Sequence, residues 1–199
     1  AASRASGVAH VVAHTQEEVA SLVAVTLSRG GVRVIEWRSD RARTVGEQAA
    51  LARLPGVHAD RVEAGGLAWQ VRSRGLAAGM PLVLLHGFTG TGEFWEPVAN
   101  ALPRRRCLFP DLPGHGGSDA PRPPEAWPLD RAAEALAALL DGLGVGRFAL
   151  AGYSMGGRLA LSLALRHPER VAALALVGAT PGIADPSERE ARAAADLAL

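Results

Sequence analysis

Ser154 stands in GYSMGGR, residues 152–158, which is the pattern in this chain best suited to chemistry. An apolar run at 147–151 precedes it and predicts a buried strand, and a helical pattern follows at 159–167. A serine between glycines at such a junction predicts a nucleophile elbow, a sharp turn that lifts the hydroxyl to the top of a sheet. Larger residues than Gly152 and Gly156 would clash there, and the serine is expected to be strained. Ser154 is therefore the candidate catalytic residue.

Two backbone N–H groups are expected to face an oxyanion beside this serine. Met155 supplies one from the start of the following helix. Phe88 supplies the other from HGFTG, residues 86–90, a glycine-rich loop after the apolar run 81–85. His86 is a candidate base or substrate contact, but the favoured interpretation is that it supports the loop.

Arg158 lies four positions after Ser154, one helical turn along the same face. Its guanidinium could hold a substrate carboxylate through two hydrogen bonds, which favours a small anionic substrate. The alternative is an arginine paired with a structural carboxylate. Tyr153 is a second candidate substrate contact because it is adjacent to the serine.

The elements that must position these residues alternate between strands and helices from residue 58 onward. A turn at Gly65 and Gly66 predicts a β-hairpin. Strands are then expected at 81–85, 106–111, 147–151 and 171–177, and helices at 93–102, 129–143 and 159–167. This alternation predicts an α/β fold, with a mostly parallel sheet and helices on both faces. His115, in the turn at 112–118, is expected to bond locally.

The first 57 residues have a different pattern. Thr15 and Glu18 form a capping box for a helix, which ends at Gly30 and Gly31, and a β-branched strand follows at 32–37. Asp40 could cap a second helix to about residue 54. A helix–strand–helix unit with one strand has no sheet of its own. We therefore divide the chain into 1–57 and 58–199.

Composition excludes several classes of protein. The formal charge of +1 over 199 residues gives no electrostatic reason to bind nucleic acid. No apolar run approaches the roughly 20 residues of a membrane span, and residues 1–20 lack a signal-peptide pattern. Cys107 is the single cysteine, which fits a reducing, cytoplasmic location. No metal is expected. Because no methionine begins the chain, we expect it to start partway through a longer gene product.

LLHGF, DLPGHGGSD and GYSMGGR identify the chain as a member of the α/β-hydrolase family. More narrowly, GYSMGGR, HGFTG at 86–90 and ATPGI at 179–183 resemble the 2-succinyl-6-hydroxy-2,4-cyclohexadiene-1-carboxylate synthases, which eliminate pyruvate in menaquinone (vitamin K2) synthesis. The resemblance implies that Ser154, polarised by a histidine, acts as a base. It also implies that Arg192, rather than the nearby Arg189, binds a carboxylate at the start of a lid.

Residues 7–54 resemble the C-terminus of the thiamine-diphosphate enzyme that makes the substrate of that synthase. The likeness lies in HTQEEVASLVAVTLSRGGVRVIEWRSDRA. It implies a fusion with, or a read-through from, a neighbouring gene. That enzyme's cofactor motif is not in this sequence, so we expect no cofactor. The alternative is a generic α/β tail.

The sequence lacks the acid and the histidine that should complete the site around Ser154. On this fold the serine is followed in the chain by an acid and then by a histidine. The only later histidine, His167, would lie roughly 20 Å from Ser154 at the far end of its helix. Asp185 and Asp196 fall in the loop and the lid helix. We therefore expect a truncated domain without its lid and last strands, inactive alone, with an open sheet edge after 171–177.

Two other functions remain open from the sequence. An esterase or carbon–carbon hydrolase of the same fold would use Ser154 for acyl transfer. A non-catalytic module would pack onto a partner enzyme or assemble oligomers.

Overall fold

A computed structural model describes residues 9–13, 16–29, 31–37, 58–75, 79–122, 127–182 and 185–197. Its strands are β1 (Ala9–Ala13), β2 (Gly31–Trp37), β3 (His58–Ala64), β4 (Leu67–Arg74), β5 (Leu82–Leu85), β6 (Cys107–Pro110), β7 (Phe148–Tyr153) and β8 (Val171–Val177). Its helices are α1 (Gln16–Arg29), the 3-10 helix η2 (Gly92–Trp95), α3 (Glu96–Asn100), α4 (Leu129–Gly142), α5 (Met155–Arg166) and α6 (Pro186–Leu197). None of the helices in these ranges is long and apolar enough to cross a membrane.

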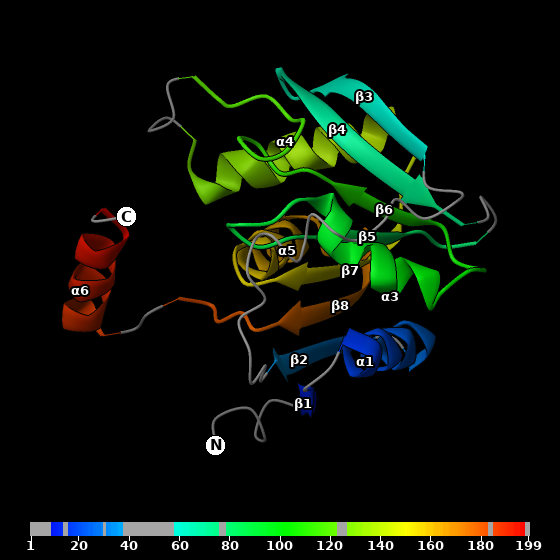
Figure 1. Cartoon of the computed structure of the whole chain (residues 1–199), viewed down its shortest axis with the longest axis horizontal. Helices are drawn as coiled ribbons and strands as arrows, with labels where there is room; N and C mark the ends of the chain where they lie inside the picture. Colours follow the sequence, from blue (N-terminus) through cyan, green and yellow to red (C-terminus); the bar gives the residue numbers. More distant parts are fainter. Residues whose placement is uncertain are drawn as a thin grey trace.

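The strands form one eight-stranded sheet in the order β1-β2-β8-β7-β5-β6-β4-β3 (Figure 1). Neighbours from β1 to β6 are parallel, whereas β4 is antiparallel to β6 and to β3. The predicted hairpin is confirmed, with Val62 opposite Trp69. The fold class is therefore the predicted α/β class with a mostly parallel sheet.

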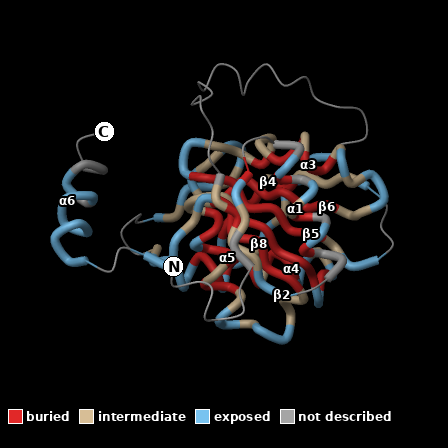
Figure 2. The backbone as a smooth tube through the Cα atoms, turned by 90° about the horizontal axis from the view of Figure 1, so that it is seen from below, coloured by how far each residue is buried: buried red, intermediate tan, exposed pale blue. Residues whose placement is uncertain are grey.

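Two hydrophobic clusters fill the two faces of the sheet, and β8 shows how the sequence builds both. Leu174 and Leu176 point to the face covered by α4 and α5. Ala173 and Ala175 alternate with them and point to the face covered by α1, η2 and α3. Successive side chains on a strand point to opposite faces, so an unbroken apolar strand needs cover on both. The buried residues accordingly lie in the middle of the molecule (Figure 2).

The N-terminal strands β1 and β2 join this sheet. β2 runs parallel to β8, with Val32 opposite Leu174 and Ile35 opposite Val177, and β1 lies outside β2. The expectation of an open edge at β8 is therefore wrong, because β2 covers it. The strand at 9–13 was not predicted from the sequence. Thr15, Asp40 and the second helix expected to about residue 54 lie outside the described residues.

Candidate active site at the carboxyl edge of the sheet

Ser154 forms the turn between β7 and α5, as its sequence pattern predicts. Its φ of 51° and ψ of −113° place it in a region that residues other than glycine rarely adopt, and it is the only such non-glycine residue in the described ranges. Its N–H donates to the Val177 carbonyl at 2.9 Å, and its carbonyl accepts from the Arg158 N–H at 3.1 Å. The serine is half-buried. Hydrogen bonds to β8 and to the first turn of α5 thus stabilise the strained turn.

The loop after β5 lies directly against this turn. A Cβ added at Gly87 would lie 3.5 Å from the Ser154 Cβ and 2.9 Å from the Tyr153 Cδ1. A Cβ at Gly156 would lie 2.4 Å from the carbonyl oxygens of Leu85 and His86. These close approaches bring the predicted oxyanion loop and the first turn of α5 together, as the use of two backbone N–H groups requires.

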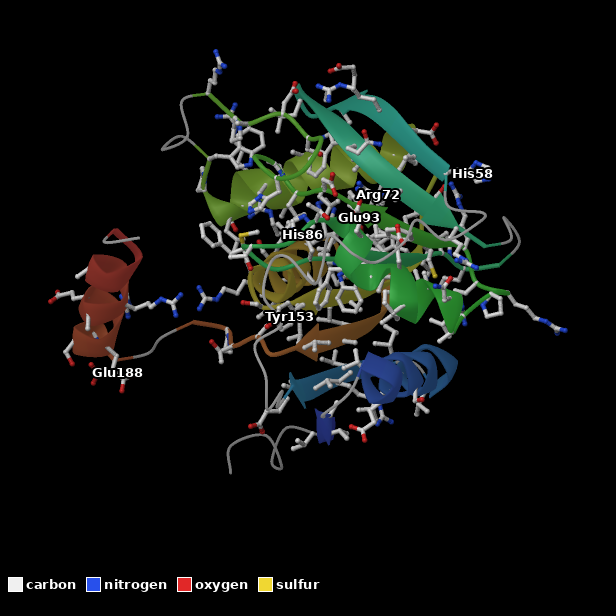
Figure 3. All side chains as sticks on the ribbon, viewed as in Figure 1. His58, Arg72, His86, Glu93, Tyr153 and Glu188 are labelled. Atoms are coloured by element: carbon white, nitrogen blue, oxygen red, sulfur yellow. The ribbon has the colours of Figure 1, made fainter. Side chains whose placement is uncertain are left out.

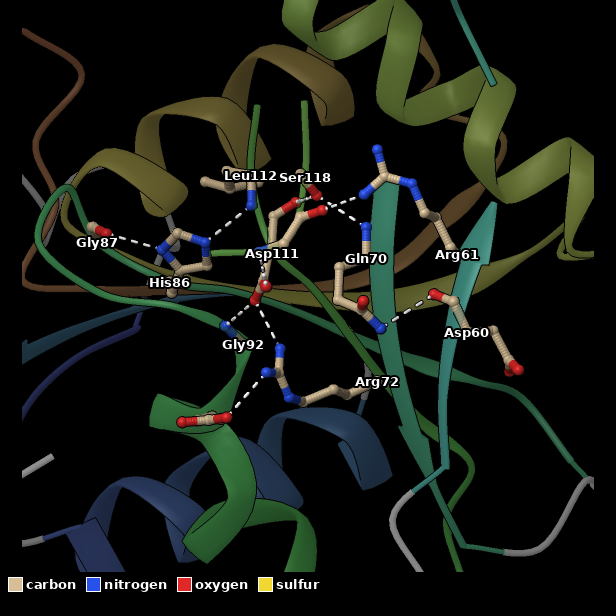
Figure 4. A network of polar contacts seen from close by, with 12 residues as sticks. Asp60, Arg61, Gln70, Arg72, His86, Gly87, Gly92, Asp111, Leu112 and Ser118 are labelled. Atoms are coloured by element: carbon tan, nitrogen blue, oxygen red, sulfur yellow. Dashed lines mark hydrogen bonds and ion pairs between the residues drawn. The ribbon is translucent and has the colours of Figure 1, made fainter. Parts of the chain in front are cut away.

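His86 supports the loop and is not available to a substrate. Its side chain is fully buried. Its Nε2 accepts from the Leu112 N–H at 2.8 Å, so Nδ1 carries the proton and donates to the Gly87 carbonyl at 2.8 Å (Figure 4). Both ring nitrogens are therefore occupied. The structure corrects the assignment of His86 as a substrate contact and agrees with its interpretation as a loop support.

Burial also makes His86 acid-sensitive. Desolvation by burial, the largest cause, lowers the pKa of His86 from 6.5 to about 4. Between these values the unfolded chain binds more protons than the folded chain, so the free energy of unfolding decreases as the pH falls from 6.5 towards 4. A difference of 1 in pKa corresponds to about 1.4 kcal/mol. We therefore expect His86 to lower the free energy of unfolding at pH 4.5 by about 2–3 kcal/mol relative to pH 7.

Urea unfolding at pH 7 and pH 4.5 measures this loss. The His86→Asn variant has no titrating group at this position and should lose less stability between the two pH values than the wild type. An equal loss in both proteins would assign the acid sensitivity to other groups.

Asp111, which no sequence motif singles out, organises the backbone around the loop. Its buried Oδ1 accepts from the Gly92 N–H at 2.7 Å and from Nη1 of Arg72 at 2.8 Å. Its Oδ2 accepts from the Gly117 N–H at 2.9 Å. Arg72 also donates through Nη2 to Glu93 at 2.8 Å (Figure 4). One ion-paired carboxylate thus fixes β4, η2 and the turn after β6 relative to one another.

The aromatic residues around the serine differ in burial. Tyr153 is half-buried and stacks on Phe94, with ring centroids 5.1 Å apart and planes at 17°. Figure 3 shows Tyr153 and His86 near the ends to which β7 and β8 point. Phe88 leaves 68% of its surface exposed. Tyr153 therefore packs on Phe94 beside the serine, and Phe88 presents an apolar ring to solvent at the same edge.

Arg158 is exposed on the first turn of α5. In the described ranges no carboxylate forms an ion pair with its guanidinium. Arg166, at the other end of the same helix, instead contacts Glu134 at 2.6 Å and Asp130 at 3.4 Å. Arg158 thus remains a cation that an anionic ligand can reach.

The remaining candidates lie away from the serine. Arg192 is an exposed residue of α6, which stands apart from the sheet in Figure 1 and Figure 2. His167 lies at the far end of α5, as its position in the sequence predicts, and its Nε2 is 3.3 Å from Glu134. The structure therefore does not bring Arg192 to the sheet edge that carries Ser154.

Two further features bear on what the chain can bind. A cavity of about 550 Å³ is lined by residues 79–80 and 101–105, at the amino ends of β5 and β6 and so at the edge opposite Ser154. It contains none of the predicted site residues. The described ranges hold no group of three potential metal-ligating side chains.

The profile of the alpha/beta hydrolase fold family matches residues 80–195, more than half of the chain. The chain belongs to the α/β-hydrolase family. Consistent with this, it superimposes on the crystal structure of Cfl2 from Burkholderia cenocepacia with a TM-score of 0.63, at 34% identity, covering 68% of this chain and 46% of that one.

Its curated relatives carry more specific names. A Bacillus subtilis protein, provisionally named a 2-succinyl-6-hydroxy-2,4-cyclohexadiene-1-carboxylate synthase, is 40% identical over 134 residues, 67% of this chain and 49% of that protein. A synthase of the same name from Enterobacter sp. is 39% identical, covering 63% and 48%. Lipase LipV of Mycobacterium tuberculosis is 42% identical over 96 residues, covering 48% and 36%. The chain spans about half the length of the two synthases.

Proposed function

We propose that the protein carrying this chain is a lyase of menaquinone synthesis. It would eliminate pyruvate from 2-succinyl-5-enolpyruvyl-6-hydroxy-3-cyclohexene-1-carboxylate to give 2-succinyl-6-hydroxy-2,4-cyclohexadiene-1-carboxylate. The observation that carries the proposal is the exposed Arg158 guanidinium one turn after Ser154, because a substrate with several carboxylates needs a cation beside the reacting centre. Similarity to the named synthases supports the same reaction.

In the proposed reaction the oxygen of Ser154 removes a proton from the ring of the substrate. The electron pair of the C2–H bond forms a C2=C3 double bond, the pair of the existing C3=C4 double bond moves to C4=C5, and the C–O bond from C5 to the enolpyruvyl group breaks. The group leaves as the enolate of pyruvate and takes up a proton. The N–H groups of Phe88 and Met155 would stabilise the negative charge that develops.

A serine hydroxyl is a weak base unless another group accepts its proton. Two of the described histidines near Ser154 are engaged elsewhere: His86 has both ring nitrogens occupied, and Nε2 of His115 contacts the Phe88 carbonyl. The other described histidines are remote, because His10 and His58 lie on the outermost strands and His167 ends α5. We infer that the group that polarises Ser154 comes from residues outside the described ranges. The proposal therefore concerns the natural protein that carries this sequence.

Pyruvate release from the enolpyruvyl substrate tests the function directly. The natural protein is mixed with that substrate, and pyruvate is detected by coupling to lactate dehydrogenase. Turnover of the substrate with stoichiometric pyruvate supports the proposal. No pyruvate above the uncatalysed rate, from a correctly folded protein, would refute it.

An ester hydrolase is the second candidate, favoured by the 42% identity to Lipase LipV. In that reaction Ser154 would attack a carbonyl carbon, and the same two N–H groups would stabilise a tetrahedral intermediate. A screen of p-nitrophenyl esters separates the two functions. Rapid ester cleavage without pyruvate release identifies the hydrolase, and the reverse identifies the lyase.

Arg158→Ala should raise the KM for the enolpyruvyl substrate about 10- to 100-fold, with a smaller effect on kcat. Hydrogen bonds to a charged group contribute about 1.5–3 kcal/mol, and each 1.4 kcal/mol is tenfold in affinity. Arg158→Lys should recover part of the loss, because it keeps the charge but not the paired donors.

Arg166→Ala is the matched control, since Arg166 lies on the same helix and pairs with Glu134 and Asp130. Its KM should remain that of the wild type. An unchanged KM for a folded Arg158→Ala protein would show that Arg158 does not contact the substrate.

We propose also that residues 1–57 descend from the end of a neighbouring thiamine-diphosphate enzyme and that the protein is cytoplasmic. The resemblance of residues 7–54 supports the first statement. The single cysteine of the chain, Cys107, is free and buried, and its presence without a partner supports the second statement. The DNA on both sides of the reading frame tests the origin of the segment.

A further inference from the structure

Histidines hold the two consecutive peptide groups on either side of Phe88. The carbonyl of the Gly87–Phe88 peptide accepts from Nδ1 of His86 at 2.8 Å and from the Gly90 N–H at 3.1 Å. The carbonyl of the next peptide, that of Phe88, lies 2.6 Å from Nε2 of His115. Phe88 itself is thus flanked by two anchored peptide planes.

His115 reaches this loop from a different part of the chain. It lies in the turn after β6, and its Nδ1 is 3.1 Å from the Pro113 carbonyl. Its ring meets the His86 ring edge-on at 5.2 Å and the Phe88 ring at 5.9 Å. The local contact agrees with the sequence analysis, but the shorter contact is to Phe88, which the sequence analysis did not predict. His115 therefore connects the turn after β6 to the loop after β5.

The Phe88 side chain cannot perform this anchoring. With 68% of its surface exposed, it has little packing to fix its backbone. The Phe88 N–H belongs to the Gly87–Phe88 peptide plane, and His86 and Gly90 hold the carbonyl of that plane. The plane can still turn about that carbonyl unless the Phe88 carbonyl, which is joined to it through φ and ψ of Phe88, is held as well. A donor that acts on a transition state must already be aimed when the charge develops.

We propose that His115 is a positioning residue of the oxyanion loop: by donating Nε2–H to the Phe88 carbonyl, it keeps the Phe88 N–H directed at the space beside Ser154. A carbonyl oxygen can only accept, so the shorter contact, to Phe88, places the hydrogen on Nε2; the longer contact of Nδ1 with the Pro113 carbonyl is a hydrogen bond only when both ring nitrogens carry hydrogen. The inference deepens the proposed function and rests on it, since it assigns the Phe88 N–H its role there. It applies equally to pyruvate elimination and to ester cleavage.

Two substitutions separate the hydrogen bond from the ring. His115→Phe keeps an aromatic ring but has no donor, whereas His115→Gln places an amide N–H near the position of Nε2. The ¹⁵N order parameters of the Phe88 and Thr89 amides are measured in the present chain, where no substrate is needed. We expect values of about 0.85 in the wild type and in His115→Gln, and values below about 0.6 in His115→Phe.

Kinetics of the natural protein, with whichever substrate it turns over, form the second measurement. His115→Phe should lower kcat about 10-fold or more with KM within about 3-fold, because removal of an oxyanion donor acts on kcat. His115→Gln should stay within about 3-fold of the wild type in both. A protein that only lost stability would show a lower melting temperature in both variants without this division between kcat and KM.

Each outcome decides the proposal. Rigid Phe88 and Thr89 amides in His115→Phe would overturn it, and so would mobile amides with an unchanged kcat or an effect confined to KM. If the natural protein turns over neither substrate, the proposed function fails. In that case the order parameters still decide whether His115 holds the loop, so the two failures are distinguishable.

Discussion

Replacing Ser154 with alanine is expected to reduce pyruvate release by the natural protein about 10³-fold or more. Ser154 is half-buried at a turn whose φ of 51° is unusual for serine, next to the loop that carries Phe88. A positioned base contributes about 10²- to 10⁴-fold to a rate, and alanine supplies no oxygen to take its place. The melting temperature should change little, because the side chain is not part of the core.

Ser162→Ala is the matched control. Ser162 lies on the same helix and donates its hydroxyl hydrogen to Asp130 at 3.1 Å, away from the elbow. It should keep wild-type kcat and lose a little stability. Near-normal kcat/KM in Ser154→Ala would remove Ser154 from the reaction, whatever the substrate.

Gly156→Ala should have the largest effect on stability. A Cβ at this position would lie 2.4 Å from the carbonyl oxygens of Leu85 and His86 and 2.6 Å from the Leu85 carbonyl carbon. These are backbone atoms of β5 and of the adjoining loop, which cannot move like the end of a side chain. We expect a loss of about 3 kcal/mol or more, or about 6–12 °C in melting temperature for a chain of this size.

Gly142→Ala is the comparison, since it is also a helical glycine changed to alanine. No atom lies within 4 Å of a Cβ at Gly142, and alanine is favoured over glycine in a helix by up to about 1 kcal/mol. This variant should be as stable as the wild type or more so. Equal melting temperatures for Gly156→Ala and Gly142→Ala, by calorimetry, would contradict the packing argument.

The elements around the serine were predictable because their signals are local. The apolar runs of β5 and β8 correspond to strands covered on both faces, and the glycines at 152 and 156 indicate a tight approach. The helices α1, α4 and α5 begin and end within a few residues of the predicted limits. In these segments the residues that determine helix or strand formation lie close together in the sequence.

Pairing between distant segments was not predictable in the same way. Nothing in the sequence of β2 indicates that it will pair with β8, which lies about 140 residues later. β1 has only five residues, and its apolar pattern is too short to distinguish from a loop. From the sequence alone, residues 32–37 are therefore a strand without a partner.

The polar network was missed for a related reason. Asp111 and Arg72 lie 39 residues apart, and each is an ordinary end-of-strand charge when seen alone. The two residues form an ion pair only because the folded sheet places β4 beside β6. The interpretation of His86 as a loop support succeeded because its partner at Gly87 is its neighbour in the chain.

Because β2 and β1 lie beyond β8, the strand that leads into Ser154 has three strands on one side of it and four on the other. Amide protons in β7 are therefore expected to be among the last to exchange with solvent, since a sheet frays from its outer strands inward. The sharp bend would keep its shape during such partial openings. Its distortion would then be lost only when the whole molecule unfolds.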